Sequence, residues 1–598
     1  MAERGVETAR RLAALRDVMR RESMAAYIFP TGDPHCGEFV PDHWKGREYI
    51  SGFSGSAGTA VVTMTAAALW TDSRYFLAAE EQLEGTPFVL MRQGVDGTPS
   101  VAQWTGRQLA RSAVTDVGID GMTATAAAVA ALRDQLREQG GLTLRTNCDP
   151  LDVIWADRPP LPKGRVIVHP MAYAGESAVS KLARIRAALK ERNADGTLVS
   201  ALDDIAWTLN LRGEDVHCNP VFVAFLLVTR ESATLFVDRA KLTDGAVRQL
   251  AECRVAIEDY GAVARALRAY DSYSILMDSA GTCHTLYNMV RCPKVIDAPS
   301  PVTAMKAVKN DVEISGFRAA MTRDGVAMVS MLRTLREDVA RGGLTELAVS
   351  RRLEELRAAQ PLYRGPSFDT IAAYGAHGAV VHYEPTTASD SPLRPEGLLL
   401  IDSGAHYDDG TTDITRTVAL GHVTDEQRRA YTLVLKAHIA LARLVFPRGA
   451  AGTQIDAIAR SVLWREGMNY LHGTGHGVGS CLNVHEGPQQ IRMEWVGAPL
   501  LPGMTVTDEP GLYVPGRFGV RTENTMLVVP HAETPFGRFV AFEPLTLCPI
   551  DTAPLITGML TSDEREWLND YHRTVCDRLA PVLDTPEKDW LRDATAPL

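Results

Sequence analysis

Paired cysteines are missing from this chain of 598 residues. Its nine cysteines stand singly and are odd in number, which does not suit the disulfide framework of a small secreted protein. No CxxC pair occurs, so the usual sequence sign of a zinc ribbon or a thiol redox centre is missing too. We therefore expect reduced, structural cysteines. They are Cys36, Cys148, Cys218, Cys253, Cys283, Cys292, Cys481, Cys548 and Cys576.

Long apolar runs and blocks of basic residues are also missing. The most apolar stretch, Val221–Val228, is far shorter than the ~20 residues that a membrane-spanning helix needs. The net charge is -11 and no Lys/Arg block offsets it, which argues against a nucleic-acid partner. The Arg-rich start also carries acidic residues and has Leu12, Leu15, Val18 and Met19 at helical spacing, which favours an amphipathic surface helix over a transit peptide. We expect a cytoplasmic protein without membrane contact.

The bulk composition is that of an ordinary soluble globular protein, with 45% hydrophobic and 23% charged residues. Because one hydrophobic core rarely serves so long a chain, we expect three domains. The segment DRPPLPKG (157–164) is rich in Pro and Gly, as a linker would be, and a helical pattern follows residue 304. The predicted domains are 1–160, 161–304 and 305–598.

A weak internal repeat links the first two predicted domains. Two segments, SGFSGSAGTAVVTMTAAALWTDSRY and RGEDVHCNPVFVAFLLVTRESATLFVDR, each run from a Gly-containing loop into two strands, and this predicts two related α/β domains. The alternative is that any hairpin bounded by Asp shows such a pattern. The shared positions are Ala67, Leu69, Trp70 and Asp72 in one segment, and Ala233, Leu235, Phe236 and Asp238 in the other.

The third predicted domain begins with a long helical pattern. Between Val312 and Gln360, apolar residues recur at steps of three and four, which predicts helix. Methionines take part in this pattern, and we interpret them as core residues because the flexible thioether fills irregular gaps. The candidate chemistry lies after this stretch.

Five residues of this third segment are candidate metal ligands: Asp402, Asp413, His476, Glu509 and Glu523. Asp402 ends the apolar run LLLI, a predicted buried strand, and Asp409-Gly410 is a hairpin signal. After that turn Asp413 projects from one face of the returning strand, because side chains alternate along a strand. The two aspartates therefore face one cavity.

Glu509 in MTVTDEPG follows a strand-like run, and Glu523 in GVRTENTMLVV lies within another. Two such carboxylate hairpins would close on a shared pair of ions, and four carboxylates of charge -4 match two divalent cations of charge +4. Hard divalent ions prefer these donors. Each acid alone is more simply a turn cap or a surface charge, so the prediction depends on all five together.

Histidines supply the remaining candidates. His472 and His476 lie in HGTGHGVG, where three interleaved glycines make a helix implausible, so we assign one ligand, His476, and not a pair. His382 in VVHYEP and His485 in NVHEGP stand beside Pro-containing turns. Taken alone, each is more simply a packed core or surface histidine.

At these residues the chain resembles the creatinase and methionine aminopeptidase superfamily, and within it the long form of aminopeptidase P, the Xaa-Pro aminopeptidases. The passages that carry the resemblance span nearly the whole chain: GFSGSAGTAVV, WTDSRYF, LDDIAWTLNLRG, IDSGAHYDDGTTDITRT, HGTGHGVG, VHEGP, DEPG, RTEN and FEPLTLCPI. The resemblance implies an α/β (α+β) fold, with two creatinase-type N-terminal domains before a pitta-bread catalytic domain of pseudo-twofold symmetry. It also implies a homodimer.

The resemblance further implies two divalent metal ions per subunit, with Mn2+ expected and Co2+, Zn2+ or Fe2+ able to bind the same donors. Asp402 would chelate one ion, Asp413 and Glu523 would bridge both, and His476 and Glu509 would complete the other. A hydroxide bridging the metals would attack the carbonyl that precedes proline. Glu509 would carry a proton to the proline nitrogen. His382, His472 and His485 match substrate-facing catalytic histidines, and Arg74 in WTDSRYF is a candidate substrate contact or an ion-pair partner of Asp72.

The expected activity is therefore removal of the N-terminal residue from peptides with proline at the second position. A prolidase, which cleaves only Xaa-Pro dipeptides, is the nearest alternative, and the extra middle domain and FEPLTLCPI argue against it. A methionine aminopeptidase needs neither N-terminal domain. The alternative from another class is a catalytically silent binding module, which should have lost one of the five ligands.

Overall fold

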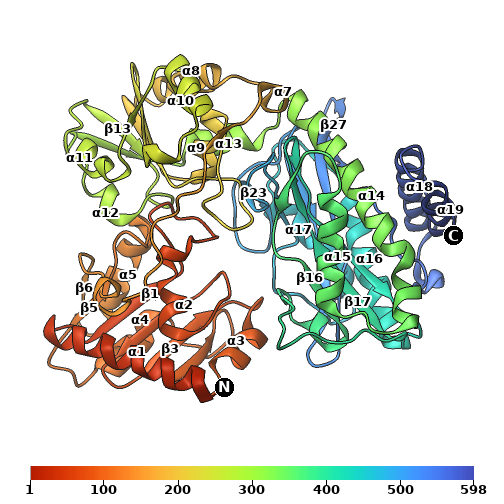
Figure 1. The fold of residues 1–598 in the computed structure, drawn as a ribbon, viewed down its shortest axis with the longest axis horizontal. Coiled ribbons are helices and arrows are strands. Elements are labelled where there is room, and N and C mark those ends of the chain that lie inside the picture. Colours follow the sequence, from red (N-terminus) through yellow and green to blue (C-terminus); the bar gives the residue numbers. More distant parts are fainter. Residues whose placement is uncertain (1) are drawn as a thin grey trace. The chain divides into compact units, whose positions relative to one another are not determined.

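The computed structural model describes residues 2–598, with side chains from Arg4 onward, and it contains two compact units. The first unit comprises the chain up to Val168 together with Ser177–Val302, and the second comprises His169–Glu176 and Thr303–Leu598 (Figure 1). No helix among the described residues is long and apolar enough to cross a membrane.

The first unit contains two six-stranded sheets with the same strand order. The first runs β4-β3-β2-β1-β5-β6, and the second runs β12-β11-β10-β8-β13-β14. In the first sheet the β1–β2 and β2–β3 pairings are antiparallel and the other pairings are parallel. In the second sheet the β8–β10 and β10–β11 pairings are antiparallel and the others are again parallel. The strands are β1 (Ala26–Pro30), β2 (Thr59–Thr63), β3 (Ala67–Thr71), β4 (Phe88–Arg92), β5 (Asp116–Ile119), β6 (Thr143–Arg145), β8 (Gly196–Val199), β10 (Phe225–Thr229), β11 (Ala233–Phe236), β12 (Val255–Glu258), β13 (Ser274–Met277) and β14 (Lys294–Asp297).

The two repeated segments of the sequence form equivalent hairpins, β2–β3 in one sheet and β10–β11 in the other. A further short pair, β7 (Ile167–Val168) with β9 (Leu211–Arg212), belongs to the same unit. Helices accompany both sheets: α1 (Ala2–Arg21), α2 (Gly46–Ser51), α3 (Phe76–Leu83), α4 (Val101–Leu109), α5 (Ala126–Glu138), α6 (Leu151–Ile154), α8 (Ala178–Glu191), α9 (Leu202–Leu209), α10 (Asp244–Glu252), α11 (Val263–Arg268) and α12 (His284–Tyr287). The predicted amphipathic helix is α1, whose Leu12, Leu15 and Met19 are buried.

The second unit is built from short antiparallel sheets and long helices (Figure 1). Its helices are α7 (Met171–Ala174), α13 (Pro301–Ala307, which starts at the boundary), α14 (Asp311–Arg341), α15 (Glu346–Ala358), α16 (Asp425–Ala442), α17 (Gly452–Trp464), α18 (Ser562–Leu579) and α19 (Thr585–Ala594). A capping box of Asn310 and Glu313 begins α14, because the two side chains satisfy backbone N–H groups that lack helical partners. Met321, Met328 and Met331 of this helix are buried, which confirms their predicted role as core residues.

The strand pairings of the second unit are antiparallel, some between consecutive strands and others between strands farther apart in the chain. The sheets are β15-β18-β19, β16-β17-β20, β21-β28-β27-β24, β22-β23 and β25-β26. Their bounds are β15 (Tyr363–Pro366), β16 (Ile371–Tyr374), β17 (Leu398–Ser403), β18 (Ala405–Tyr407), β19 (Gly410–Thr411), β20 (Ile414–Ala419), β21 (Val445–Pro447), β22 (Gly475–Gly477), β23 (Glu486–Ile491), β24 (Thr505–Asp508), β25 (Gly511–Val514), β26 (Phe518–Arg521), β27 (Asn524–Thr534) and β28 (Gly537–Pro544).

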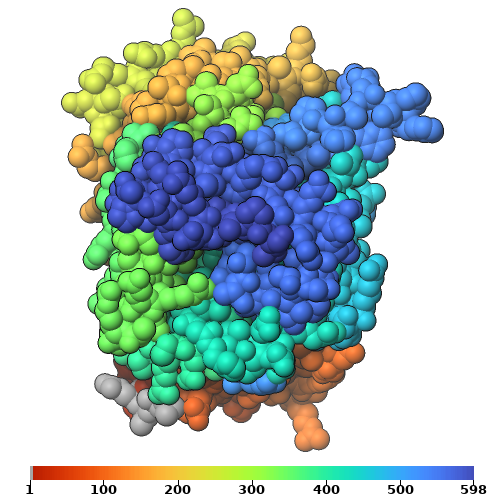
Figure 2. All heavy atoms as spheres, turned by 90° about the vertical axis from the view of Figure 1, so that its right-hand side faces the viewer, coloured from red at the N-terminus to blue at the C-terminus, as the bar shows by residue number. Residues whose placement is uncertain are grey.

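The C-terminal helices α18 and α19 form part of the surface of the second unit, in dark blue in Figure 2. They are anchored by an apolar cluster that joins Leu568, Val575 and Leu579 of α18 to α16 and to strand β26. Burial of such side chains contributes about 1.5–3 kcal/mol each. The C-terminal segment is thereby part of the core of the unit and not an appendage.

Candidate metal centre

Two neighbouring strands carry the candidate aspartates. Asp402 lies on β17, and Asp413 immediately precedes β20. The two strands are antiparallel, with Asp402 opposite Thr415. The turn between β18 and β19 contains Asp409, as the Asp-Gly signal predicts. Both aspartates are buried, and this burial, together with the charge of Asp413, contributes to raising the pKa of Asp402.

A second antiparallel pair carries the glutamates. Strands β24 and β27 are in register with Asp508 opposite Asn524, so Glu509 directly follows one strand and Glu523 directly precedes the other. The expectation that Glu523 lies within a strand is therefore wrong, because the chain breaks its ladder between β26 and β27 at this point. The Glu523 backbone N–H donates instead to the Thr415 carbonyl, 3.1 Å away, which ties the two strand pairs together.

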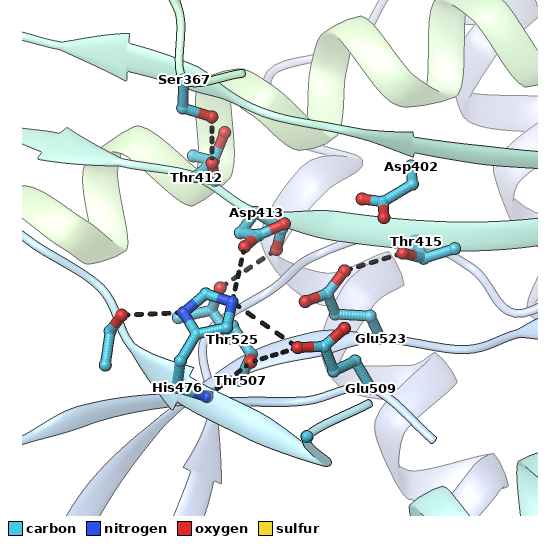
Figure 3. A network of polar contacts seen from close by, with 12 residues as sticks. Ser367, Asp402, Thr412, Asp413, Thr415, His476, Thr507, Glu509, Glu523 and Thr525 are labelled. Carbon is cyan, nitrogen blue, oxygen red and sulfur yellow. Dashed lines mark hydrogen bonds and ion pairs between the residues drawn. The ribbon is translucent and has the colours of Figure 1, made fainter. Parts of the chain in front are cut away.

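The ligand atoms of Asp413, His476 and Glu523 all lie within 4.8 Å of one another. The His476 Nε2 atom is 3.4 Å from Asp413 Oδ2 and 3.6 Å from Glu509 Oε1. Figure 3 shows these four side chains pointing toward one another, with Asp402 on the adjoining strand. The structure thus brings together residues that span more than a hundred positions of sequence, although their role as ligands stays a prediction.

Threonines surround the carboxylates (Figure 3). The Thr415 hydroxyl donates to Glu523 Oε2 at 2.7 Å, and the Thr525 hydroxyl donates to the Asp413 backbone carbonyl at 3.0 Å. The Thr507 hydroxyl accepts from the His476 backbone N–H at 3.1 Å. These bonds fix the orientation of the candidate ligands, as supporting groups do around metal sites.

Strand β22 approaches β24 closely at Gly475. A Cβ atom at this position would lie 1.9 Å from the Thr507 carbonyl oxygen, so only glycine permits the contact. His476 is the next residue, on the same short strand. The glycines of HGTGHGVG therefore form an extended segment and not a helix, as the sequence predicted.

Asp402 has a partner that the sequence analysis missed. Arg521, which is 1% exposed, donates from Nη2 to Asp402 Oδ2 at 2.5 Å and from Nη1 to the Tyr513 hydroxyl at 2.6 Å. The signal was present in RTEN, where an arginine stands two residues before a candidate ligand, but nothing local shows which carboxylate it meets. A buried arginine that holds one oxygen of Asp402 leaves the other, Oδ1, for a different ligand.

Burial sets the protonation behaviour of this cluster. Burial, assisted by neighbouring carboxylates, raises the pKa of Glu509 to about 7 and that of Glu523 well above its usual range. Burial also raises the pKa of Asp402, although Arg521 opposes the shift. For His476, burial alone would lower the pKa, but its hydrogen bond to Asp413 and the nearby Glu509 charge raise it to about 9. Crowded, buried carboxylates resist ionisation, and bound cations would favour their charged forms.

These residues fit a pair of divalent ions. Asp402 Oδ1 is buried and has no hydrogen-bond partner among the side chains that the structure describes, which is unfavourable unless another group binds it. Four carboxylates and one imidazole are donors suited to manganese and similar ions. Their negative charge would be offset by two such cations.

The other candidate histidines lie near this cluster. The His485 ring packs edge-on against His476, with ring centroids 4.4 Å apart. The His472 Nε2 atom lies 2.9 Å from the Tyr513 hydroxyl, which in turn binds Arg521. His382 lies in the segment before β17. Its neighbour Val381 accepts from Arg521 Nη2 at 3.4 Å through its carbonyl.

A buried ion pair holds the segment with His472 and His476. Asp456 and Arg460 of α17 are 2% and 1% exposed, and Arg460 Nε donates to Asp456 Oδ2 at 2.6 Å. Arg460 also donates to the carbonyls of Tyr470 and His472 at 2.6 and 2.7 Å. The Thr474 hydroxyl donates to the other oxygen of Asp456 at 2.5 Å. Asp456 and Arg460, one turn apart on α17, thus fix the segment that leads to His476.

Arg74 lies in the first unit. It donates from Nε and Nη2 to both oxygens of Asp72, at 2.9 and 2.8 Å, and its Nη1 is 3.6 Å from Glu38 Oε1. The ion pair with Asp72 is therefore present. Substrate contact by Arg74 stays a prediction.

Four family models match consecutive parts of the chain. The Creatinase/Prolidase N-terminal domain matches residues 11–146 and, in a second version, residues 157–313. Metallopeptidase family M24 matches residues 315–530, and the C-terminal region of peptidase M24 matches residues 538–598. All five candidate ligands fall inside the metallopeptidase match.

Full-length relatives and solved structures agree with these matches. The chain is 38% identical over 613 residues to a probable Xaa-Pro aminopeptidase P of Aspergillus niger, covering 99% of both chains. The crystal structure of an X-prolyl aminopeptidase from Caenorhabditis elegans, described as a cytosolic enzyme with a di-nuclear active site, matches with a TM-score of 0.95 and 34% identity over 99% of this chain and 100% of that one. A Xaa-Pro dipeptidase from Bacillus anthracis matches only 63% of this chain and 99% of its own, with 25% identity and a TM-score of 0.51. These findings confirm the predicted fold class, two creatinase-type domains followed by a pitta-bread domain.

Proposed function

Because this chain belongs to the Xaa-Pro aminopeptidase P family of M24 metallopeptidases, we propose that it hydrolyses the first peptide bond of peptides with proline at the second position. The observation that carries this proposal is the convergence of Asp413, His476 and Glu523 within 4.8 Å in a chain that is related over its whole length to such an enzyme. Two divalent ions belong to this activity, since the relative of known structure has a di-nuclear site.

We propose Mn2+ as the metal, and Asp402, Asp413, His476, Glu509 and Glu523 are the residues that would hold the two ions. When bound, the ions would supply a Lewis acid for the carbonyl oxygen and would lower the pKa of water, so that hydroxide is available near neutral pH. Co2+, Zn2+ and Fe2+ accept the same donors, and their order of affinity does not by itself select one.

The side chains around the ions then have separable tasks. Glu509 receives the proton of the nucleophilic water and transfers it to the proline nitrogen, because an amine leaves readily only when protonated. His485 or His382 donates to the oxyanion that develops at the carbonyl. His472, held by Tyr513, shapes the pocket for the proline ring. An Xaa-Pro bond has no N–H group, so recognition must use the ring.

The dipeptidase alternative is disfavoured by coverage. The dipeptidase of known structure leaves more than a third of this chain unmatched, whereas the aminopeptidase of known structure covers 99% of it. A silent binding module is disfavoured because all five candidate ligands are present. We further propose a cytoplasmic homodimer with domains at 1–160, 161–304 and 305–598.

The test combines metal analysis with peptide cleavage. The purified protein should contain two divalent ions per chain and release Arg from Arg-Pro-Pro. A chelator should abolish this activity, and added Mn2+ should restore it. Cleavage of an Xaa-Pro dipeptide without cleavage of the tripeptide would support prolidase, and full activity in metal-free protein would overturn the proposal.

A further inference from the structure

A completely buried arginine, Arg416, binds the backbone next to the candidate ligand Glu523. Arg416 of β20 follows Thr415, whose hydroxyl binds Glu523, and its side chain is 1% exposed. It donates to the backbone carbonyls of Thr415 and Glu523 at 3.0 and 2.7 Å, and to the Asn524 amide oxygen at 2.9 Å. The guanidinium therefore holds the chain on both sides of the peptide bond that joins Glu523 to Asn524.

The same guanidinium also binds the C-terminal segment. Arg416 donates to the carbonyls of Cys548 and Pro549 at 2.8 and 3.2 Å, which explains the FEPLTLCPI passage in physical terms. Its Nη2 atom donates to the Tyr571 hydroxyl of α18 at 2.8 Å. Six acceptors share the five N–H donors of this planar fork, and Asn524, Cys548 and Tyr571 share the two hydrogens of Nη2. Because the fork is rigid, a shift of α18 would be transmitted to Glu523, which directly precedes β27.

Tyr571 closes this network. It is 5% exposed and lies parallel to Trp567, with ring centroids 5.4 Å apart. Its hydroxyl accepts from Arg416, and its single proton is shared among three acceptors: Asn524 Oδ1 at 3.2 Å and the carbonyls of Thr546 and Cys548 at 3.0 and 2.9 Å. Without this hydroxyl, Arg416 would lose an acceptor and the Asn524 side chain would lose a neighbour. Both groups contact the peptide unit of Glu523.

We propose that Tyr571 is a positioning residue for the metal centre, and that the C-terminal extension serves to hold Glu523 through Arg416 and Asn524. This inference rests on the proposed function, in which Glu523 is a shared metal ligand. Groups that orient a ligand without touching the metal typically contribute about 10-fold to 100-fold to metal affinity. Helix α18 therefore contributes to metal affinity from the surface side of the unit.

The test is the Tyr571→Phe variant, with Tyr431→Phe as its matched control. Tyr431 of α16 is also buried, and its hydroxyl donates to the Asp551 carbonyl at 2.7 Å, so it ties the same C-terminal segment to the core. No hydrogen bond among the described residues joins its side chain to Arg416 or Asn524. Mn2+ binding to metal-free protein is measured by calorimetry for both variants and the wild type. We expect Tyr571→Phe to weaken binding of at least one ion about 10-fold or more, and Tyr431→Phe to leave it within about 2-fold of the wild type.

The outcomes separate the two proposals. If wild-type protein does not bind two ions, the proposed function fails. If the wild type binds two ions and Tyr571→Phe binds them equally well, or if both variants weaken binding equally, only the role of Tyr571 is overturned. Should Tyr571→Phe be insoluble, Asn524→Ser removes the amide that Arg416 and Tyr571 share, and unchanged Mn2+ affinity in that variant would also contradict the inference.

Discussion

Replacing Asp456 with Asn tests whether the buried Asp456–Arg460 ion pair fixes the segment that carries His472 and His476. The carboxylate of Asp456 neutralises a guanidinium that is 1% exposed, and its second oxygen accepts from Thr474. In the variant, Arg460 keeps its bonds to the carbonyls of Tyr470 and His472 but lacks a counter-charge. Removing one partner of a buried ion pair costs about 3–5 kcal/mol, because the other charge stays buried.

The size of the expected shift follows from the size of the unit. The second unit has about 300 residues, and unfolding entropy of roughly 2.1 cal/mol/K per residue gives about 0.6 kcal/mol/K. A loss of about 3–5 kcal/mol then lowers the melting temperature of this unit by about 5–8 °C. The transition of the second unit is the one that rises with added Mn2+, since a ligand stabilises the state that binds it.

The assay is calorimetric unfolding alongside tripeptide cleavage. Asp456→Asn should also lower kcat about 10-fold or more, because the segment with His472 and His476 loses its anchor. The exposed pair of Glu426 and Arg517 offers a control, with side chains 50% and 56% exposed. Such pairs contribute about 0–1 kcal/mol, so Glu426→Gln should shift the melting temperature by less than about 2 °C.

A double variant separates charge from packing. Asp456→Leu combined with Arg460→Met removes both charges and should recover most of the lost stability, since apolar replacements of buried ion pairs are often neutral. Its kcat should stay low, because the carbonyls of Tyr470 and His472 lose their donor. A melting temperature for Asp456→Asn within about 1 °C of the wild type would refute the reasoning.

Further outcomes follow from other residues. Asp413→Ala should abolish cleavage of Arg-Pro-Pro while circular dichroism shows that the first unit stays folded; full activity would contradict its assignment as a ligand. Glu346 accepts hydrogen bonds from Tyr374 N, His377 Nδ1, the Tyr383 hydroxyl and Ser391 N. Glu346→Gln should therefore lower the free energy of unfolding by about 2–3 kcal/mol and lower kcat, because these contacts hold the segment with His382. An unchanged melting temperature would contradict this expectation. Burial lowers the pKa of His35 from 6.5 to about 3, so protonation favours the unfolded first unit. The contribution of neutral His35 to the stability of the first unit is present above pH 6.5 and falls by about 1.4 kcal/mol per pH unit toward pH 3. The free energy of unfolding of His35→Gln, measured by denaturant melts, should lack this dependence on pH.

Short-range patterns predicted much of the architecture. Apolar spacing located α1 and α14, and the shared hairpin pattern indicated two related sheets, which have the same strand order. The Asp409-Gly410 signal indicated a reversal of the chain, and the structure has it between β18 and β19. The flanking strands β17 and β20 pair, with Asp402 in β17 and Asp413 directly before β20. These features follow from the sequence because helix and strand periodicity involves residues a few positions apart.

The location of Glu523 and the identity of its supports did not follow from such patterns. It lies in a break between two strands, which the smooth alternation of GVRTENTMLVV conceals. Arg521 stands two residues before Glu523, but the partner of Arg521, Asp402, is 119 positions away. In the sequence, Asp456 and Arg460 have the spacing of an ordinary ion pair one helical turn apart. Only the fold shows that this pair is buried and bound to Thr474.

The sequence by itself predicted a candidate donor set and, from its four carboxylates, two cations. Tertiary structure alone decided that Asp402 is shared with Arg521, and that Arg416 joins helix α18 to Glu523, directly before β27. The physical reason is that a donor's chemical type is a property of one residue. Its hydrogen-bond partners instead depend on how distant segments pack, and buried polar groups must find such partners wherever the fold places them.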